Sequence, residues 1–401
     1  MSVAGIIIEY DPLHTGHVHL MRETRRMLGE DTAIIGVMSG DFVQRGEFAV
    51  VGKYARAEAA VKSGMDLVLE LPLPWAVASA ERFADGGVRA LMGTGLVTHL
   101  TFGSECGDAA GLRQVAECLC SPAYEAALKE RLNSGASFAS CRQAAVEAVL
   151  GETAKLLESP NNTLGIEYCK ALARHGSSIR PVTVKRSGSA HNGVLMEGEH
   201  PSASAIRELL FAGEREQALA LMAPAMRETY LTEESAGRAP VFGEACERAV
   251  LARLRMMTTA DFAALDEGRE GLSNRLYEAS RSATSVKEIL ETAKTKRYAY
   301  ARLRRTVLWA YLGLVPQEQP EEIPYLRPLA ANEKGRSLLA QMRKSTSVPV
   351  VTKAAHVREL GEEAQRLFEL ECRAADLYTL AYPDLSAAQG GRMWRESPVL
   401  V

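Results

Sequence analysis

The chain has 401 residues, of which 47% are hydrophobic and 24% are charged, so intrinsic disorder and fibrous repeats are excluded as its main class. This length predicts two domains of ordinary size. The formal net charge of -3 does not indicate a nucleic-acid binder, so a surface of that kind would need a local concentration of basic residues.

Neither a membrane span nor a secretion signal is evident in the sequence. No uncharged apolar stretch reaches the roughly 20 residues that a membrane-spanning helix needs. Met1 is followed by apolar residues without a basic segment or a small-residue cleavage site. The seven cysteines include no CxxC pair, so we expect reduced thiols with no disulfide or metal role. These features predict a soluble, cytoplasmic protein.

Short apolar runs alternate with amphipathic stretches over the first hundred residues. Strands are predicted at Val3–Glu9, Ala33–Met38, Leu67–Leu71 and His99–Phe102, with helices at Gly16–Leu28, Tyr54–Ser63 and Ala84–Met92. Unbroken apolar strands that alternate with helices are typical of a parallel sheet covered on both faces. The first part of the chain is therefore predicted to be an α/β domain.

The pattern changes after the first hundred residues. Helical stretches are predicted over Gly111–Leu157 and after Pro160, then a strand at Pro181–Lys185 and a helix at Ala203–Ala212. From about Arg215 the strand pattern disappears, and helical periodicity is broken near Ala236–Gly243, Gly268–Gly271 and Pro316–Pro328. We predict an α/β domain over residues 1–215 and a mainly helical domain over residues 216–401. The last dozen residues are expected to form a loosely held tail.

The most informative motif follows the first predicted strand. His14-Thr-Gly-His17 begins the first predicted helix, and a helix N-terminus presents N–H groups and partial positive charge to a phosphate. Gly16 leaves room for a nucleotide, and His14 and His17 share one face of the first turn. Both histidines could stabilise charge that develops during displacement at an α-phosphorus. A surface turn with two chance histidines is the alternative, but α/β domains bind ligands at this end of a strand.

Further candidate site residues follow the other predicted strands or begin two later helices. The candidates are Lys53, Gly103, Asn162, Arg186, Ser204 and Arg207. Lys53, Arg186 and Arg207 are candidates to hold a triphosphate or a leaving pyrophosphate. A solvated helix surface is the alternative for Lys53, and a helix cap is the alternative for Asn161 and Asn162.

One segment concentrates positive charge. Lys294–Arg305 contains six basic residues and no acidic residue. If this segment is helical, Arg297, Arg304 and Arg305 share a face with Lys294 near it, while Leu303, Val307 and Leu308 pack inward. Such a stripe suits RNA phosphates, and Tyr298 and Tyr300 could stack on unpaired bases. A solvated helix with both tyrosines in the core is the alternative, which the segment alone favours.

Longer blocks of sequence resemble the tRNA(Met) cytidine acetate ligase family, within the HIGH-type nucleotidyltransferase superfamily. These blocks cover both predicted domains and are Gly5–His17, Gly40–Gly46, Phe102–Glu105, Pro160–Tyr168 and Lys294–Tyr298. One departure is visible, because the family usually has Asn where this chain has Asp11. A carboxylate there is unfavourable beside a triphosphate unless it faces away or meets magnesium.

The resemblance implies a Rossmann-like nucleotidyltransferase domain followed by a tRNA-binding domain. It implies a carbon–nitrogen ligase that converts acetate and ATP to acetyl-adenylate and pyrophosphate. The acetyl group then passes to N4 of the wobble cytidine of elongator tRNA(Met), and AMP is released. Mg²⁺ is expected with the triphosphate, and no obligate protein partner is evident.

The expected site residues form three sets. The catalytic set is His14, His17 and Lys53. The ATP-binding set is Ile7, Ile8, Glu9, Tyr10, Asp11, Pro12, Leu13, His14, Thr15, Gly16, His17, Val18, His19, Leu20, Gly103, Asn162, Arg186, Ser204 and Arg207. The tRNA-binding set is Lys294, Lys296, Arg297, Arg304 and Arg305.

Two other functions remain open on the sequence. The first is a nucleotidyltransferase that adenylylates a small phosphorylated metabolite, which leaves the second half of the chain unexplained. The second is an RNA-binding or assembly factor that retains a nucleotide pocket only as a relic. ATP–pyrophosphate exchange would separate the three functions. Exchange that requires acetate supports the ligase, exchange that requires another acceptor supports the adenylylating enzyme, and no exchange supports the relic.

Overall fold

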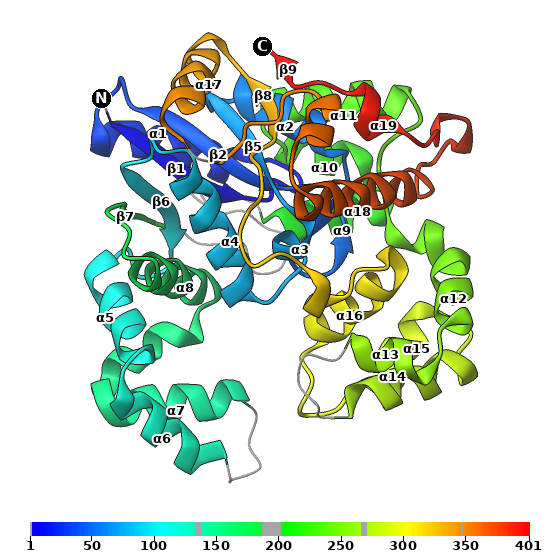
Figure 1. Ribbon diagram of the computed structural model, residues 1–401, viewed down its shortest axis with the longest axis horizontal. Coiled ribbons are helices and arrows are strands. Elements are labelled where there is room, and N and C mark those ends of the chain that lie inside the picture. The colour runs from blue at the N-terminus through cyan, green and yellow to red at the C-terminus, as the bar shows by residue number, and fades with distance from the viewer. Residues whose placement is uncertain (1, 133–137, 187–201, 266–270, 347) are drawn as a thin grey trace.

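A seven-stranded sheet forms the centre of the molecule (Figure 1). The computed structural model describes residues 2–132, 138–186, 202–265, 271–346 and 348–401. The strands of this sheet are β1 (Val3–Ile8), β2 (Ala33–Ser39), β5 (Leu67–Leu71), β6 (His99–Ser104), β7 (Arg180–Lys185), β8 (Pro328–Ala331) and β9 (Val399–Leu400). A separate antiparallel hairpin consists of β3 (Phe42–Val43) and β4 (Glu47–Phe48).

The strand order places the carboxyl ends of β1 and β6 at a topological switch point. Across the sheet the order is β7-β6-β1-β2-β5-β8-β9, and the first five of these strands are parallel. The chain therefore moves outward from β1 through β2 to β5 and then returns to the other side of β1 for β6 and β7. In open α/β sheets, ligands bind outside the carboxyl ends at this kind of reversal. The predicted α/β fold is confirmed.

Helices cover both faces of the sheet, as the unbroken apolar strands require. One face is covered by α4 (Ala80–Gly93), α5 (Ala109–Leu119), α8 (Pro160–Arg174) and α17 (Glu333–Ser345). The other face is covered by α1 (Thr15–Leu28), α2 (Lys53–Lys62), α9 (Ala203–Phe211), α10 (Arg215–Leu221) and α11 (Pro224–Ser235). Successive side chains of β1 alternate between these layers, so Ile7 lies in the first core and Ile6 and Ile8 lie in the second.

A second, helical region lies beside the sheet (Figure 1). Its helices are α12 (Glu247–Met256), α13 (Thr259–Ala264), α14 (Leu272–Ser282), α15 (Val286–Ala293) and α16 (Tyr300–Leu312). They share an apolar core with α18 (Glu362–Thr379) and with Phe42 of the β3–β4 hairpin. The remaining helices are α3 (Leu73–Ala76), α6 (Pro122–Leu132), α7 (Phe138–Leu150) and α19 (Arg392–Arg395). The predicted break over residues 268–270 lies outside the described residues.

Two expectations about the C-terminal part are wrong, namely that strands end before residue 215 and that the last dozen residues form a loose tail. β8 follows residue 215 yet pairs with β5, and β9 pairs with β8, so the chain returns to the sheet. The last dozen residues are also held, because Met393 is 1% exposed and its carbonyl oxygen accepts a hydrogen bond from Arg327. Both strands are short, and the pairing of β8 with β5 joins residues far apart in the sequence. The division at residue 215 stays a prediction, although α10 and α11 pack on the sheet.

None of the helices in the described ranges is both long enough and apolar enough to cross a bilayer.

Packing of the C-terminal segment can be tested at Met393. We expect Met393→Ala to lower the free energy of unfolding by about 2–5 kcal/mol, because it removes a buried side chain and leaves a cavity. Met256 is 78% exposed, so Met256→Ala is the matched control with an effect of about 0.5 kcal/mol or less. Urea unfolding of both variants measures the difference, and equal midpoints would show that the segment contributes nothing to stability.

Candidate active site

The turn after β1 carries the chain into α1 through an unusual backbone conformation. Tyr10 has φ +49°, which is rare for a residue other than glycine, and its side chain is buried. The next part of the turn is fixed from outside, because Leu13 accepts a hydrogen bond from the Ala223 backbone at 3.1 Å. His14 also forms an isolated β-bridge with Met222. These contacts hold the start of α1 at the carboxyl end of β1.

Backbone amides orient both histidines of the motif. Nδ1 of His14 accepts a hydrogen bond from the Gly16 N–H at 3.1 Å, and Nδ1 of His17 accepts one from the His14 N–H at 3.2 Å. The two rings stack with their centroids 3.7 Å apart. Since each Nδ1 accepts, each neutral ring carries its proton on Nε2, where it can donate to an oxyanion. The prediction that both histidines share one face of the first turn is confirmed.

The N-terminus of α1 keeps its positive character. Its first turn contains no acidic residue, so no carboxylate of that turn offsets the partial charge of the helix dipole. Ile7, Ile8 and Leu13 of the predicted ATP-binding segment are buried and serve mainly to support the turn. The two imidazoles at this helix start cap the helix, and His14 is 3% exposed.

Arg207 reaches this turn from α9. Its Nη1 donates to the carbonyl oxygen of Asp11 at 2.7 Å, and its Nη2 lies 3.4 Å from Ser204 Oγ. The structure therefore brings Arg207 to the β1–α1 turn, with Ser204 beside it, although both are almost two hundred residues away in the chain. Ser202 caps α9 by accepting a hydrogen bond from the Ala205 N–H at 3.1 Å.

The Asp11 carboxylate faces the protein interior. It is 3% exposed, its Oδ1 accepts a hydrogen bond from the Val50 N–H at 2.7 Å, and its Oδ2 lies 3.5 Å from Arg207. Burial raises the pKa of Asp11, while Arg207 opposes that shift. We expected a carboxylate at this position either to face away from the triphosphate or to meet magnesium. The structure shows a carboxylate that faces away, into the protein.

Residues after β6 form the other side of the switch point. The Arg186 side chain packs over Gly103, where an added Cβ would lie 3.2 Å from Arg186 Cγ. Asn162 is buried, and its Oδ1 accepts a hydrogen bond from the Cys106 N–H at 3.1 Å. Gly103 and Arg186 are thus in contact, as their joint assignment to one site requires.

The start of α8 is capped from outside the helix. The expectation that Asn161 or Asn162 supplies the cap is wrong, because the Glu105 carboxylate accepts hydrogen bonds from both of their backbone N–H groups, at 3.2 and 2.8 Å. The Asn161 side chain also donates to Glu105, at 2.7 Å. This carboxylate therefore links the end of β6 to the residues that the sequence places near the nucleotide.

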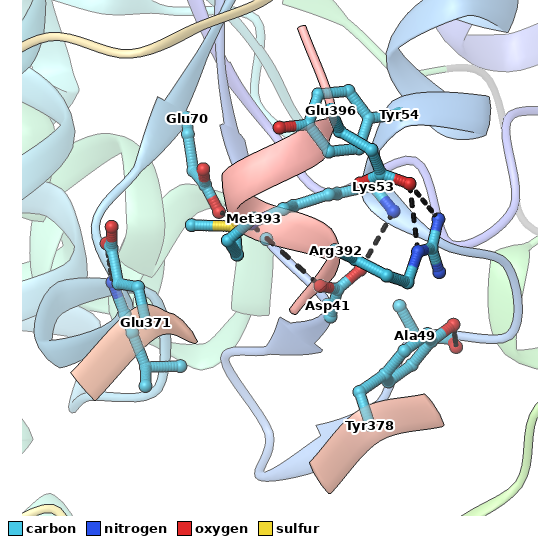
Figure 2. A network of polar contacts seen from close by, with 12 residues as sticks. Asp41, Ala49, Lys53, Tyr54, Glu70, Glu371, Tyr378, Arg392, Met393 and Glu396 are labelled. Carbon is cyan, nitrogen blue, oxygen red and sulfur yellow. Dashed lines mark hydrogen bonds and ion pairs between the residues drawn. The ribbon is translucent and has the colours of Figure 1, made fainter. Parts of the chain in front are cut away.

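Lys53 belongs to a buried ionic network rather than to the histidine pair (Figure 2). Its ammonium group is 2.6 Å from Glu70, 3.9 Å from Asp41 and 3.0 Å from the sulfur of Met393. Burial opposes the charge of Lys53, but the two carboxylates outweigh it and raise the pKa. The side chain is 4% exposed, and its charge is neutralised within the protein. The structure therefore does not support Lys53 as a phosphate-handling catalytic residue.

The predicted basic helix is interrupted. α15 ends at Ala293 and α16 begins at Tyr300, so the expectation that one helix aligns Lys294 with Arg304 is wrong. Lys294 donates to the carbonyl oxygens of Thr295 and Tyr298 at 2.8 and 2.7 Å, which closes the intervening loop. The loop then breaks the helical register on which the shared face depended.

The basic side chains of this segment divide into two groups. Lys296 and Arg297 are exposed on the loop. Arg304 instead pairs with Glu47, and Arg305 Nη1 lies 3.5 Å from the carbonyl oxygen of Gln44, so both contact the β3–β4 hairpin. Leu303, Val307 and Leu308 are buried, as predicted.

The two tyrosines of the segment face the protein. Tyr298 is 3% exposed, which places it in the core as the alternative interpretation expected. Tyr300 is half-buried under the Arg304 guanidinium, 4.8 Å from the ring centroid. Neither is presented as an open stacking surface for a base.

Sequence reasoning missed Glu47 and the Met222–Ala223 segment. Glu47 directly follows the glycine-bounded loop Ser39–Gly46. The only local signal is an acid near the cations Arg45, Lys53 and Arg56. Met222 and Ala223 contact the turn through backbone groups, so their side chains carry no signal. Within the described ranges, no group of three or more His, Cys, Asp or Glu side chains is arranged to hold a metal ion.

Comparison with known proteins identifies the family. The model of the family described as HIGH Nucleotidyl Transferase matches residues 1–392. The chain is 36% identical to the tRNA(Met) cytidine acetate ligase of Fervidobacterium nodosum over 98% of this chain and 97% of that protein. It is also 36% identical to the protein of that name from Acetivibrio thermocellus, with 100% of both chains covered. The chain belongs to the tRNA(Met) cytidine acetate ligase family.

Solved structures agree with this family assignment over the full length. Apo TmcAL from Thermotoga maritima is 32% identical and superposes with a TM-score of 0.94, with 100% of both chains covered. TmcAL from the same organism bound with alpha-thio ATP gives a TM-score of 0.92 at 32% identity, over 100% of this chain and 99% of that one. This chain therefore shares its overall architecture with the Thermotoga maritima protein.

The network around Lys53 predicts a pH dependence of stability. Burial and the nearby Glu70 raise the pKa of Glu371 from an ordinary value of 4.5 to about 7. The folded chain therefore retains a proton that the unfolded chain releases, and stability from this group is lost as the pH rises from about 4.5 to 7.

We expect Glu371→Gln to remove this loss, because glutamine stays neutral throughout. The free energy of unfolding of the natural chain should fall relative to that of the variant between pH 4.5 and 7. Urea unfolding at several pH values measures the difference. A difference that is constant with pH would contradict the raised pKa.

Proposed function

We propose that the protein activates acetate with ATP and transfers the acetyl group to N4 of the wobble cytidine of elongator tRNA(Met). The observation that carries the proposal is the histidine pair held by backbone amides at the start of α1. It lies on a chain that matches proteins named tRNA(Met) cytidine acetate ligase from end to end. The similar Thermotoga maritima protein binds an ATP analogue, which supports ATP as the nucleotide.

In the first step an acetate oxygen attacks the α-phosphorus of ATP. A P–O bond to acetate forms, the bond to the β-phosphate bridging oxygen breaks, and pyrophosphate leaves with the electron pair. Negative charge grows on the phosphoryl oxygens, where the Nε2–H groups of His14 and His17 and the amides of α1 stabilise it. Arg207, which contacts the turn, and Ser204, which contacts Arg207, are suited to the phosphates.

In the second step the cytosine amine attacks the acetyl carbonyl carbon of the adenylate. A C–N bond forms, the bond from the carbonyl carbon to the phosphate oxygen breaks, and AMP leaves, while the amine loses a proton. A mixed anhydride is reactive enough that this step needs mainly correct placement of the amine. Arg186 over Gly103 and the buried Asn162 are suited to hold the nucleotide while the base approaches.

Magnesium enters this proposal with the triphosphate. Mg²⁺ prefers to keep several waters and to bind substrate phosphates rather than an all-protein cage. The Asp11 carboxylate, the acidic group of the turn for which we expected a possible magnesium role, is already bound to Val50 and Arg207. When bound, the ion would neutralise charge on the leaving pyrophosphate.

Adenylylation of a small metabolite explains less of the structure. That reaction needs little beyond the α/β domain, whereas this chain completes its sheet with residues from its C-terminal part. The exposed Lys296 and Arg297 lie on the helical region, and they support an RNA acceptor.

The role of His17 predicts the loss of acetyl transfer on substitution. We expect His17→Ala to reduce the rate by about 10²–10³-fold, because one donor to the developing charge is removed. The measurement is mass analysis of N4-acetylcytidine formed from labelled acetate, ATP and tRNA. His356 is exposed and lies in another part of the chain, so His356→Ala is the matched control. Circular dichroism verifies folding, and a folded His17→Ala variant with nearly full activity would refute the role.

The loop cations predict a change in salt dependence. We expect the double change Lys296→Ala and Arg297→Ala to weaken tRNA binding and to flatten the plot of log affinity against log salt concentration by about 1–2 units, because up to two phosphate contacts are lost. Lys287→Ala removes an exposed cation from α15 and is the control. An unchanged slope in the double variant would exclude this loop from the RNA interface.

A further inference from the structure

A single carboxylate joins the phosphate side of the site to the helical region. Glu47, the first residue of β4, lies 3.4 Å from Arg207 Nη2 and also forms an ion pair with Arg304 Nη1 of α16. The Glu47 side chain is 30% exposed, and those of Arg207 and Arg304 are 21% and 36% exposed. Ion pairs that are partly shielded from water are screened less than surface pairs, so this carboxylate can restrain both guanidinium groups.

Arg207 connects Glu47 to the β1–α1 turn. While Nη2 faces Glu47, Nη1 donates to the Asp11 carbonyl oxygen at 2.7 Å. The guanidinium group is planar and rigid, so fixing one nitrogen fixes the direction of the other. Glu47 therefore adds a restraint on Arg207 to the one from the Asp11 carbonyl oxygen.

The hairpin that carries Glu47 is itself fitted against α16. Gly46 has φ +79°, and a Cβ at this residue would lie 2.6 Å from the Arg305 backbone nitrogen, so only glycine allows the approach. The Gln44 carbonyl oxygen faces Arg305 at 3.5 Å, and the Gln44 N–H donates to Glu9 at 2.7 Å. A second line of contacts thus runs from α16 through the same hairpin to the end of β1.

We propose that Glu47 is a positioning residue for the two-step reaction. It holds Arg207 at the nucleotide and α16 at the RNA side in one fixed relation, so that the adenylate and the acceptor base meet. This inference rests on the proposed function, because it concerns how that site is joined to its RNA partner. It predicts that Glu47 acts through two different arginines on two different substrates.

Glu47→Gln tests this because it removes the charge and keeps the size. We expect the KM for ATP in acetate-dependent pyrophosphate exchange without RNA to rise about 3–10-fold through Arg207. The KM for tRNA in acetyl transfer should rise by a similar factor through Arg304. The kcat of exchange should change less than the KM for ATP, which a general loss of folded protein would not produce. Glu362→Gln, which alters an exposed pair on α18, is the control.

Combined variants assign each effect to its arginine. In an Arg304→Gln background, Glu47→Gln should still raise the KM for ATP but should no longer raise the KM for tRNA. In an Arg207→Gln background the pattern should be reversed. The proposal would be overturned if Glu47→Gln raised both KM values in each background by the same factors as in the natural chain. It would also be overturned if Glu47→Gln alone left both KM values within twofold of those of the natural chain.

Two further measurements keep the test decisive. If Glu47→Gln does not fold, Arg304→Gln alone must raise the KM for tRNA at least threefold without raising that for ATP, and failure overturns the inference. ATP affinity is measured by calorimetry in parallel. If the natural chain binds ATP but shows no acetate-dependent exchange either without or with tRNA, the proposed function fails, while the ATP dissociation constants still decide whether Glu47 acts on Arg207.

Discussion

Two hydrogen bonds from backbone amides to imidazole nitrogens orient the histidine pair on which the proposed chemistry rests. By occupying Nδ1 of His14 and of His17, they leave the proton of each neutral ring on Nε2 and hold the rings in a stack. The same turn of helix places a positive dipole end at this position. A phosphate at this position meets several donors whose directions are set before it arrives, which is the condition under which hydrogen bonds stabilise developing charge most. The proposed reaction therefore depends on the geometry of one helix start.

The rest of the fold maintains that helix start at the reversal of the sheet. The strained Tyr10, the Leu13–Ala223 hydrogen bond and the Arg207 contact all act on the few residues between β1 and α1. On the far side of β2, the ionic network of Lys53 and Glu70 is closed by Met393 from the C-terminal segment. Breaking a buried pair of this kind costs far more than the pair contributes, and the C-terminal segment packs against this pair through Met393.

Local patterns in the sequence were sufficient for the parallel half of the fold and for the histidine pair. Strands such as β1 and β2 are apolar throughout because both of their faces are covered, and the HxGH motif encodes its geometry within four residues. Contacts between distant residues were not accessible. The partners of Lys53 include a side chain 340 residues away, and β8 has only four residues, too few for a periodic signal. The loop at Lys294–Ala299 breaks a helical pattern through side-chain bonds to its own carbonyls, which composition cannot reveal.

We propose above all that the histidine turn catalyses the formation of acetyl-adenylate. Exchange of labelled pyrophosphate into ATP, measured with and without acetate and with and without total tRNA, tests it most directly. We predict exchange that requires acetate, either without RNA or, if RNA binding completes the site, only in its presence. No exchange under any of these conditions, or exchange that is independent of acetate, would contradict the claim.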